Sequence, residues 1–69
     1  MYAIEVQYWG TVGATASYYK TLELAFWRYK EIEEQSYNAS YNISSVVLRH
    51  VESGNIQRAS YRSFKKSHV

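Results

Sequence analysis

The chain of 69 residues contains no cysteine, no proline and no aspartate. The absence of cysteine excludes disulfide bonds, thiolate zinc sites and cysteine nucleophiles. The absence of aspartate argues against a carboxylate cage for a hard cation. His50 and Glu52 are two residues apart on one predicted strand, but no third ligand follows at a metal-site spacing. We therefore expect no bound metal.

Long hydrophobic runs and catalytic motifs are also missing. The uncharged stretch over residues 8–19 is rich in Gly, Thr, Ala and Ser, so it does not suit a transmembrane helix. No charged leader precedes an apolar segment, which argues against secretion. The chain has no phosphate-binding loop, no Gly-x-Ser-x-Gly turn and no His-Glu-x-x-His pair. These absences predict a cytoplasmic protein that is no enzyme and has no cofactor and no membrane partner.

The chain does contain enough apolar side chains to fold. Hydrophobic residues make up 46% of it and charged residues 20%, a balance typical of a folded domain. Eight tyrosines, two tryptophans and two phenylalanines supply large side chains for a small core. We expect one domain over residues 1–64, followed by a basic and frayed tail over residues 65–69.

Alternation predicts strands in the first third of the chain. Residues 2–8 alternate apolar and polar side chains, which is typical of a half-buried strand. Gly10 and Gly13 permit a turn after it. Residues 14–20 suit either a loop or a short second strand, and their threonine and tyrosines favour the strand. The inward positions of the first strand are Tyr2, Ile4, Val6 and Tyr8.

A helix over residues 21–36 is the most clearly predicted element. Thr21 suits the N-cap and Glu23 suits the first turn, where the helix dipole favours negative charge. No glycine or proline interrupts the segment, and Asn38 is expected to end it in a left-handed conformation. The apolar stripe at helical spacing consists of Leu22, Ala25, Phe26, Tyr29 and Ile32, widened on one flank by Leu24 and Trp27.

A hairpin is predicted for the last third of the chain. Residues 43–52 are rich in β-branched side chains, residues 56–64 alternate, and Gly54 lies in the turn between them. The register of this hairpin stays open. The result is an α+β domain in the order β(β)αββ, with one amphipathic helix packed on a three- or four-stranded antiparallel sheet. One helix covers only one face of such a sheet, so the other face meets solvent or a partner.

We expect the uncovered sheet face to be basic, because side chains alternate along each strand. The expected inward residues of the two C-terminal strands are Val46, Leu48, Ala59 and Tyr61. The expected outward residues are Arg49, Arg58, Ser60 and Arg62, joined by Trp9 beyond the first strand. Such a face suits a protein interface, a nucleic-acid platform extended by Lys65 and Lys66, or an ordinary solvated surface.

Acidic residues gather near the end of the predicted helix. Glu31, Glu33 and Glu34 lie where the helix dipole disfavours negative charge, so they either contact a basic partner or solubilise the surface. The charge of the whole chain is uneven as well. Residues 1–36 carry a net charge of −2 and residues 37–69 a net charge of +4. This asymmetry favours a charged partner.

Several general features of the chain, taken together, are similar to those of a known class of small proteins. It is free of cysteine and rich in tyrosine, Lys20-Thr21-Leu22-Glu23-Leu24-Ala25 enters its one helix, and Gly54-Asn55 turns its later hairpin. In these respects it resembles small phage-encoded accessory proteins, including anti-CRISPR and other anti-defence inhibitors. The resemblance implies an inhibitor that blocks a host nucleic-acid-acting complex by protein–protein contact in the host cytoplasm. Many such inhibitors are acidic DNA mimics, and the net charge of +2 departs from that pattern, so contact with a protein is favoured over mimicry.

Two further possibilities remain open. The alternative function is a module that binds or sequesters a nucleic acid or a nucleotide through a basic sheet face. A homodimer is also expected, with pairing through an edge strand, because face-to-face packing brings the arginines of two copies together. The expected partner-binding residues are Trp9, Arg49, Arg58, Arg62, Lys65, Lys66, Glu31, Glu33 and Glu34.

Overall fold

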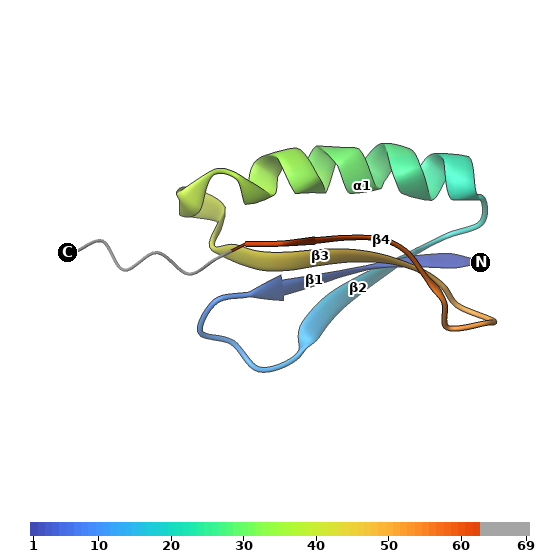
Figure 1. The fold of residues 1–69 in the computed structure, drawn as a ribbon, viewed down its shortest axis with the longest axis horizontal. Coiled ribbons are helices and arrows are strands. Elements are labelled where there is room, and N and C mark those ends of the chain that lie inside the picture. Colours follow the sequence, from blue (N-terminus) through green and yellow to red (C-terminus); the bar gives the residue numbers. More distant parts are fainter. Residues whose placement is uncertain (63–69) are drawn as a thin grey trace.

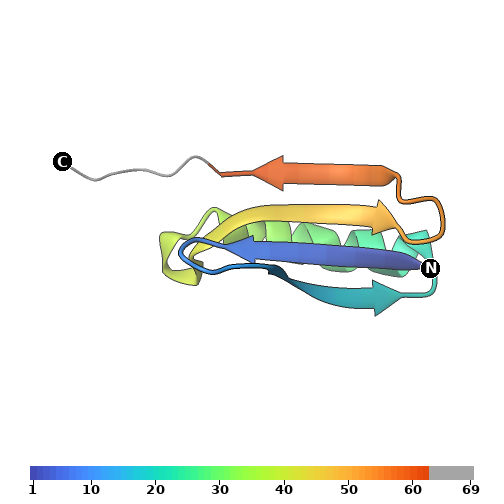
Figure 2. The ribbon, with the colours of Figure 1, turned by 90° about the horizontal axis from the view of Figure 1, so that it is seen from below.

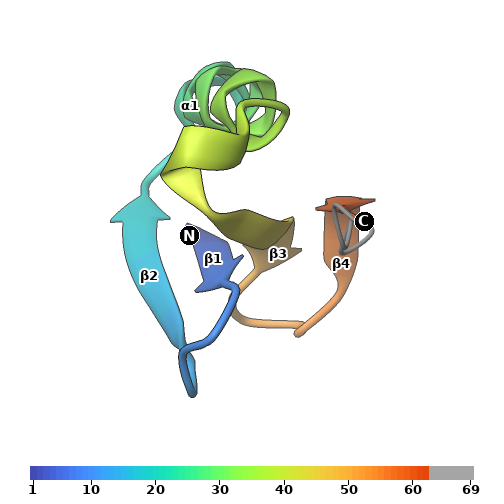
Figure 3. The same ribbon diagram turned by 90° about the vertical axis from the view of Figure 1, so that its left-hand side faces the viewer.

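Two antiparallel hairpins and the helix that joins them make up the fold (Figure 1). The computed structural model describes residues 1–62. The elements are β1 (Tyr2–Tyr8), β2 (Ala14–Tyr19), α1 (Leu22–Ser36), the 3₁₀ helix η1 (Ala39–Tyr41), β3 (Ile43–His50) and β4 (Ile56–Tyr61). The strands form one antiparallel sheet in the order β2-β1-β3-β4, and α1 lies across one face of it (Figure 2, Figure 3). The predicted α+β class is confirmed, including a strand within residues 14–20.

The start of α1 is also as predicted. The Thr21 hydroxyl accepts a hydrogen bond from the backbone N–H of Leu24 at 3.2 Å, so Thr21 is the N-cap. Glu23 lies in the first turn, where the helix dipole stabilises its charge.

The predicted left-handed residue after α1 is wrong. Asn38 has a φ of −95°, and its side-chain oxygen accepts from the N–H of Ser40, so Asn38 caps η1 instead. The left-handed residue is Asn42, with a φ of 59°. Its side-chain amide donates to the carbonyl of Trp9 at 2.8 Å, which ties the start of β3 to the end of β1. Asparagine tolerates this conformation because its short amide can satisfy backbone groups nearby.

The core lies between α1 and the two central strands. It is built from Ile4, Val6, Ala25, Tyr29, Ile32, Ile43, Val46 and Leu48. Tyr29 is the largest of the fully buried side chains, with 1% of its surface exposed. Burial raises the pKa of the Tyr29 phenol, and the carboxylate of Glu33 raises it further. Tyr2 and Tyr8 of β1 pack at the margin of this core, as predicted.

The apolar stripe of α1 differs from the prediction at its flanks. Ala25, Tyr29 and Ile32 are buried, but Leu22 is exposed and Phe26 is only half-buried. Leu24 and Trp27 do not widen the stripe, because they are 59% and 73% exposed. The buried stripe runs instead from Ala25 to Ser36, and the hydroxyl of Ser36 donates to the carbonyl of Glu33.

The predicted facing of β4 is wrong. Val46 pairs with Ser60 and Leu48 pairs with Arg58, and paired residues of antiparallel strands point to the same face. Arg58 and Ser60 therefore lie on the helix side of the sheet. Ser60 is buried, whereas Tyr61 is 67% exposed on the opposite face.

The position of α1 explains this facing. The helix packs chiefly on β3, with fewer contacts to β1 and β2, and β4 lies beside it (Figure 3). On the helix side of β4, Arg58 is thus flanked by α1 and stays exposed, whereas the small side chain of Ser60 is buried. Arginine suits such a position, because its stem can pack while its guanidinium stays at the surface. Ala59 and Tyr61 consequently face away from the helix.

No helix within residues 1–62 is both long and apolar enough to cross a membrane. The predicted frayed tail, with Lys65 and Lys66, lies outside the described residues.

Candidate protein-binding surface

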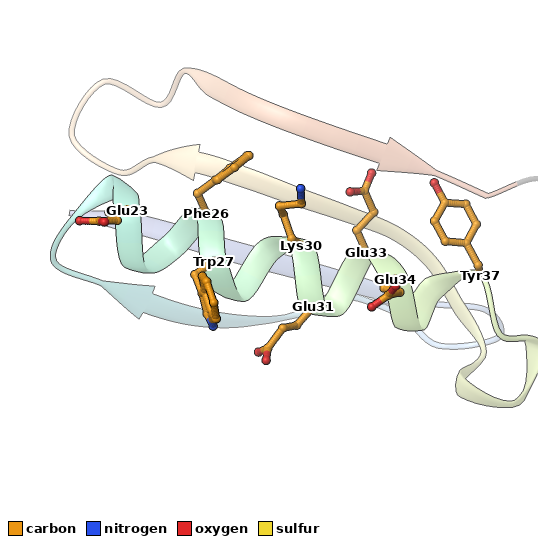
Figure 4. A pocket seen from close by; sticks show the side chains of 8 residues that line it. All are labelled: Glu23, Phe26, Trp27, Lys30, Glu31, Glu33, Glu34 and Tyr37. Atoms are coloured by element: carbon orange, nitrogen blue, oxygen red, sulfur yellow. The ribbon is translucent and has the colours of Figure 1, made fainter.

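The outward side of α1 forms a shallow groove of about 610 Å³ (Figure 4). Most of its lining residues are three or four positions apart, so they share the side of the helix turned away from the buried stripe. We define the acidic-aromatic face by the residues that line this groove, which are Glu23, Phe26, Trp27, Lys30, Glu31, Glu33, Glu34 and Tyr37. Phe26, Lys30, Glu33 and Tyr37 point toward β4, whereas Trp27 and Glu31 point the other way (Figure 4).

Two large aromatic side chains of this face are mostly in contact with solvent. Trp27 is 73% exposed and Tyr37 is 67% exposed. An exposed tryptophan leaves a large apolar area in water, and burial of that area against a partner is favourable. Tryptophan, tyrosine and arginine are also the residues that most often dominate binding energy at protein interfaces.

The charge of the face is negative. Four of its eight lining residues are glutamates, and Lys30 is the lysine among them. Arg28, beside the groove, donates to Glu31 at 2.9 Å, and this hydrogen bond raises the pKa of Arg28. The last turn of α1 contains no basic residue that would offset Glu33 and Glu34. The carboxylates therefore add to the negative end of the helix dipole.

Cations from β4 border the other side of the groove. The guanidinium of Arg58 lies over the ring of Phe26, and that of Arg62 lies over the ring of Tyr37, 4.1 Å from its centroid. Arg62 also donates to the hydroxyl of Ser60. These contacts hold the two rings against β4, whereas the side chain of Trp27 points away from β4 (Figure 4).

The predicted basic sheet face is not formed by the described residues. Of the three arginines assigned to it, only Arg49 lies there, and its charge is paired with Glu5 at 3.2 Å. Arg49 also donates to the carbonyl of Gly54 at 2.9 Å. Arg58 and Arg62 lie on the helix side instead. Trp9 follows β1, where its backbone N–H donates to the carbonyl of Asn42 at 2.9 Å.

The structure does bring the three predicted glutamates together with aromatic side chains. Glu31, Glu33 and Glu34 lie on one face with Trp27 and Tyr37, neither of which is among the predicted binding residues. The sequence contains a signal for Trp27. It lies four positions after Glu23 and four before Glu31, a spacing that places it on the charged side of the helix.

His50 and Glu52 are tied into the turn between β3 and β4. His50 Nδ1 is 2.7 Å from the Ser53 hydroxyl, and His50 Nε2 is 3.3 Å from a carboxylate oxygen of Glu52. The same oxygen accepts a hydrogen bond from the ammonium group of Met1 at 3.0 Å, and this bond lowers the pKa of Glu52. Within the described part of the chain, no cluster of three or more histidine or acidic side chains is placed to hold a metal ion.

Comparison with known proteins gives no indication of function, so the surface described above is the basis for a proposal. No protein-family model, no curated protein and no solved structure matches the chain.

Proposed function

We propose that the chain is a small, non-enzymatic binding protein of the cytoplasm that covers a basic, nucleic-acid-binding surface of another protein with its acidic-aromatic face. In its finer form, the proposal is a phage-encoded inhibitor that blocks a host nucleic-acid-acting defence complex by protein–protein contact. The finer form rests on the resemblance in general character and not on a homologue.

The observation that carries the proposal is the exposure of Trp27 among glutamates. At 73% exposure, the indole contributes little to folding, so a role in binding accounts for it better than a role in the core. The surrounding carboxylates define the chemistry of the partner. Protein surfaces that bind nucleic acid are rich in arginine and lysine, which pair with carboxylates, and arginine also stacks on indole rings.

The charge distribution favours this local contact over mimicry by the whole molecule. The net charge of the chain is +2, yet the lining residues of the acidic-aromatic face include four glutamates and one lysine. A partner groove that accepts α1 would therefore meet an excess of glutamates on the helix, with Arg58 and Arg62 along its border with β4. On the opposite face of the sheet, Arg49 and Glu5 neutralise each other.

Direct binding of nucleic acid remains the alternative prediction. The surface predicted for such binding contains Arg49, Arg58 and Arg62. The fold places these three arginines on two different faces of the sheet. The discriminating property is salt dependence, because each neutralised phosphate releases counterions. Tight binding of the purified chain to DNA or RNA that falls steeply with added salt would favour this alternative.

The test of the proposal is capture of a partner by matched variants. Wild-type chain, Trp27→Ala and Tyr61→Ala serve as parallel baits in lysate of host cells with an active defence system. Tyr61 is the control, because it is an exposed aromatic residue on the opposite face. Both substitutions lie at exposed positions, so each is expected to change stability by about 0.5 kcal/mol or less, which thermal unfolding checks.

The expected result is a nucleic-acid-binding protein that wild type and Tyr61→Ala retain and Trp27→Ala does not. Added DNA or RNA should displace it, because the chain and the nucleic acid compete for one basic surface. Retention by Trp27→Ala, or capture that nucleic acid does not affect, would contradict the proposal.

A further inference from the structure

The strand at one edge of the sheet has no protection against pairing. β2 borders β1 on one side and lies open on the other (Figure 2). Its six residues, Ala14–Tyr19, carry no charge, and all except Tyr19 are exposed. The register between β1 and β2 runs without a bulge. A regular, uncharged edge presents a row of backbone N–H and C=O groups that can accept another strand.

The other edge of the sheet is different. The pairing of β3 with β4 shifts between Leu48 and Arg49, which marks an irregularity near the start of β4. β4 also carries Arg58 in its middle. Bulges and charged residues are devices that keep edge strands from pairing. β2 has neither within its length.

We propose that β2 pairs antiparallel with β2 of a second copy, so that two chains form one continuous eight-stranded sheet. A twofold axis perpendicular to the sheet keeps the helices of both copies on the same side. Residues that lie opposite each other in the two β2 strands must then point to the same face of the sheet. Ala14, Ala16 and Tyr18 face away from the helix, because they pair with Gln7, Glu5 and Ala3 of β1.

Several registers satisfy this condition, and the two centred on Ala16 and Ser17 pair the largest part of β2. With Ala16 on the axis, Ala16 meets its own copy, Ala14 meets Tyr18, and Thr15 meets Ser17. With Ser17 on the axis, Ser17 meets its own copy and Ala16 meets Tyr18. In both registers the large ring of Tyr18, which is 61% exposed, lies beside a small alanine side chain of the other copy.

The absence of charge on β2 favours a second copy of the chain as the partner that pairs with this edge. β2 is neutral, so self-pairing brings no like charges together within the strand. The nearest charge along the chain is Lys20, directly after β2. The two Lys20 residues would lie at opposite ends of the paired strands, roughly 20–26 Å apart at the rise of an antiparallel strand. That separation exceeds the Debye length of about 8 Å at physiological salt.

This pairing goes beyond the proposed function and does not depend on it. It uses β2 and leaves the acidic-aromatic face free, so the dimer would present two such faces on one side of the sheet. Trp27→Ala is expected to keep the dimer. A variant that disrupts the β2 edge is expected to keep the contact between one chain and its partner.

The first experiment measures mass by sedimentation equilibrium over a hundredfold range of concentration. Wild type should reach twice the chain mass of 8.1 kDa, whereas Ala16→Lys should stay at the single mass. Ala59→Lys is the matched control. Ala59 is also an exposed alanine, and it lies at the other end of the cross-strand row that joins Ala16, Glu5, Val47 and Ala59. Circular dichroism checks that each variant is folded.

The expected result is loss of the dimer by Ala16→Lys and its retention by Ala59→Lys. A strictly monomeric wild type would overturn the proposal and leave β2 free for a strand of another protein. A dimer that survives Ala16→Lys but is lost in Ala59→Lys would place the contact at β4 and overturn it as well.

A second experiment identifies the register without destabilising the strand. The chain has no cysteine, so a single introduced cysteine reports only its own position. Opposite residues of antiparallel strands have Cα atoms about 4.5–5.5 Å apart, which suits a disulfide bond. Under oxidation by copper–phenanthroline, Ala16→Cys or Ser17→Cys should form a linked dimer, whichever lies on the axis, and Ala59→Cys should not. Equal linking of all three variants, or of none, would contradict the pairing.

Discussion

The guanidinium carbon of Arg58 on β4 lies 5.1 Å from the centre of the Phe26 ring on α1. The ammonium group of Lys30 lies 5.8 Å from the centre of the same ring, so the phenyl group has a cation from each element beside it. β4 is thus attached to the helix by arginine over aromatic rings, where an apolar strand face would have been expected. Cation–π contacts at surface positions contribute about 0.5–1 kcal/mol each.

A double-mutant cycle measures this attachment. Arg58→Ala and Phe26→Leu are expected to show a coupling of about 0.5–1 kcal/mol in the free energy of unfolding, because each removes one partner of the same contact. The control is Arg49→Ala with Phe26→Leu. Arg49 lies on the opposite sheet face with Glu5, so these two effects should add. Additive effects for Arg58 and Phe26 would show that the stacking does not stabilise the fold.

Tyr29, and not Phe26, is the aromatic centre of the core. Tyr29 is fully buried between α1 and the sheet, whereas Phe26 is half-buried at its margin. Tyr29→Ala is expected to cost about 3–5 kcal/mol, which can unfold so small a domain, and Phe26→Ala should cost less. Urea unfolding followed by circular dichroism provides the comparison. A larger loss for Phe26→Ala would contradict the packing described.

The same tyrosine predicts how stability depends on alkaline pH. In the unfolded chain its phenol ionises near pH 10, whereas burial raises its pKa in the folded protein. Between these two values the unfolded state loses a proton that the folded state keeps, so the free energy of unfolding falls as pH rises above about 10. Tyr29→Phe should show a flatter decline in that range. Parallel curves for wild type and Tyr29→Phe would assign the pH dependence to other groups.

The left-handed conformation of Asn42 predicts an ordering of two variants. Asn42→Gly accepts the φ of 59° without strain but loses the hydrogen bond to the Trp9 carbonyl. Asn42→Ala loses the same bond and must also adopt a conformation that its Cβ disfavours. We therefore expect Asn42→Ala to be less stable than Asn42→Gly by about 1 kcal/mol. Thermal unfolding of both variants measures the difference, and equal stabilities would refute the strain argument.

The elements with local signals were predictable from sequence. Alternation over residues 2–8 marked β1, and Thr21 before an uninterrupted run of good helix formers marked the start of α1. The facing of β4 was not predictable in the same way. Alternation allows two phases, and it predicts the more apolar pair, Ala59 and Tyr61, to face the core. Only the three-dimensional position of α1, beside β4, reveals that arginines occupy that side.

The candidate site, too, was only partly predictable from the sequence. The glutamates near the end of α1 could be identified from sequence, because they stand out as unfavourable in the helix dipole. The sequence predicts Trp27 on the flank of the buried stripe, since a large apolar residue next to an apolar stripe is usually buried. Its exposure depends on the rotation of α1 about its axis, which is set by Tyr29 packing on the sheet.

The central claim is that Trp27 anchors a basic partner on the acidic-aromatic face. Its most direct test is isothermal titration of the purified captured partner with wild type, Trp27→Ala and Tyr61→Ala. A tryptophan at the centre of an interface contributes about 2 kcal/mol or more, so Trp27→Ala should raise Kd roughly thirtyfold while Tyr61→Ala leaves Kd near the wild-type value. A wild-type Kd for Trp27→Ala, or an equal loss for Tyr61→Ala, would contradict the claim.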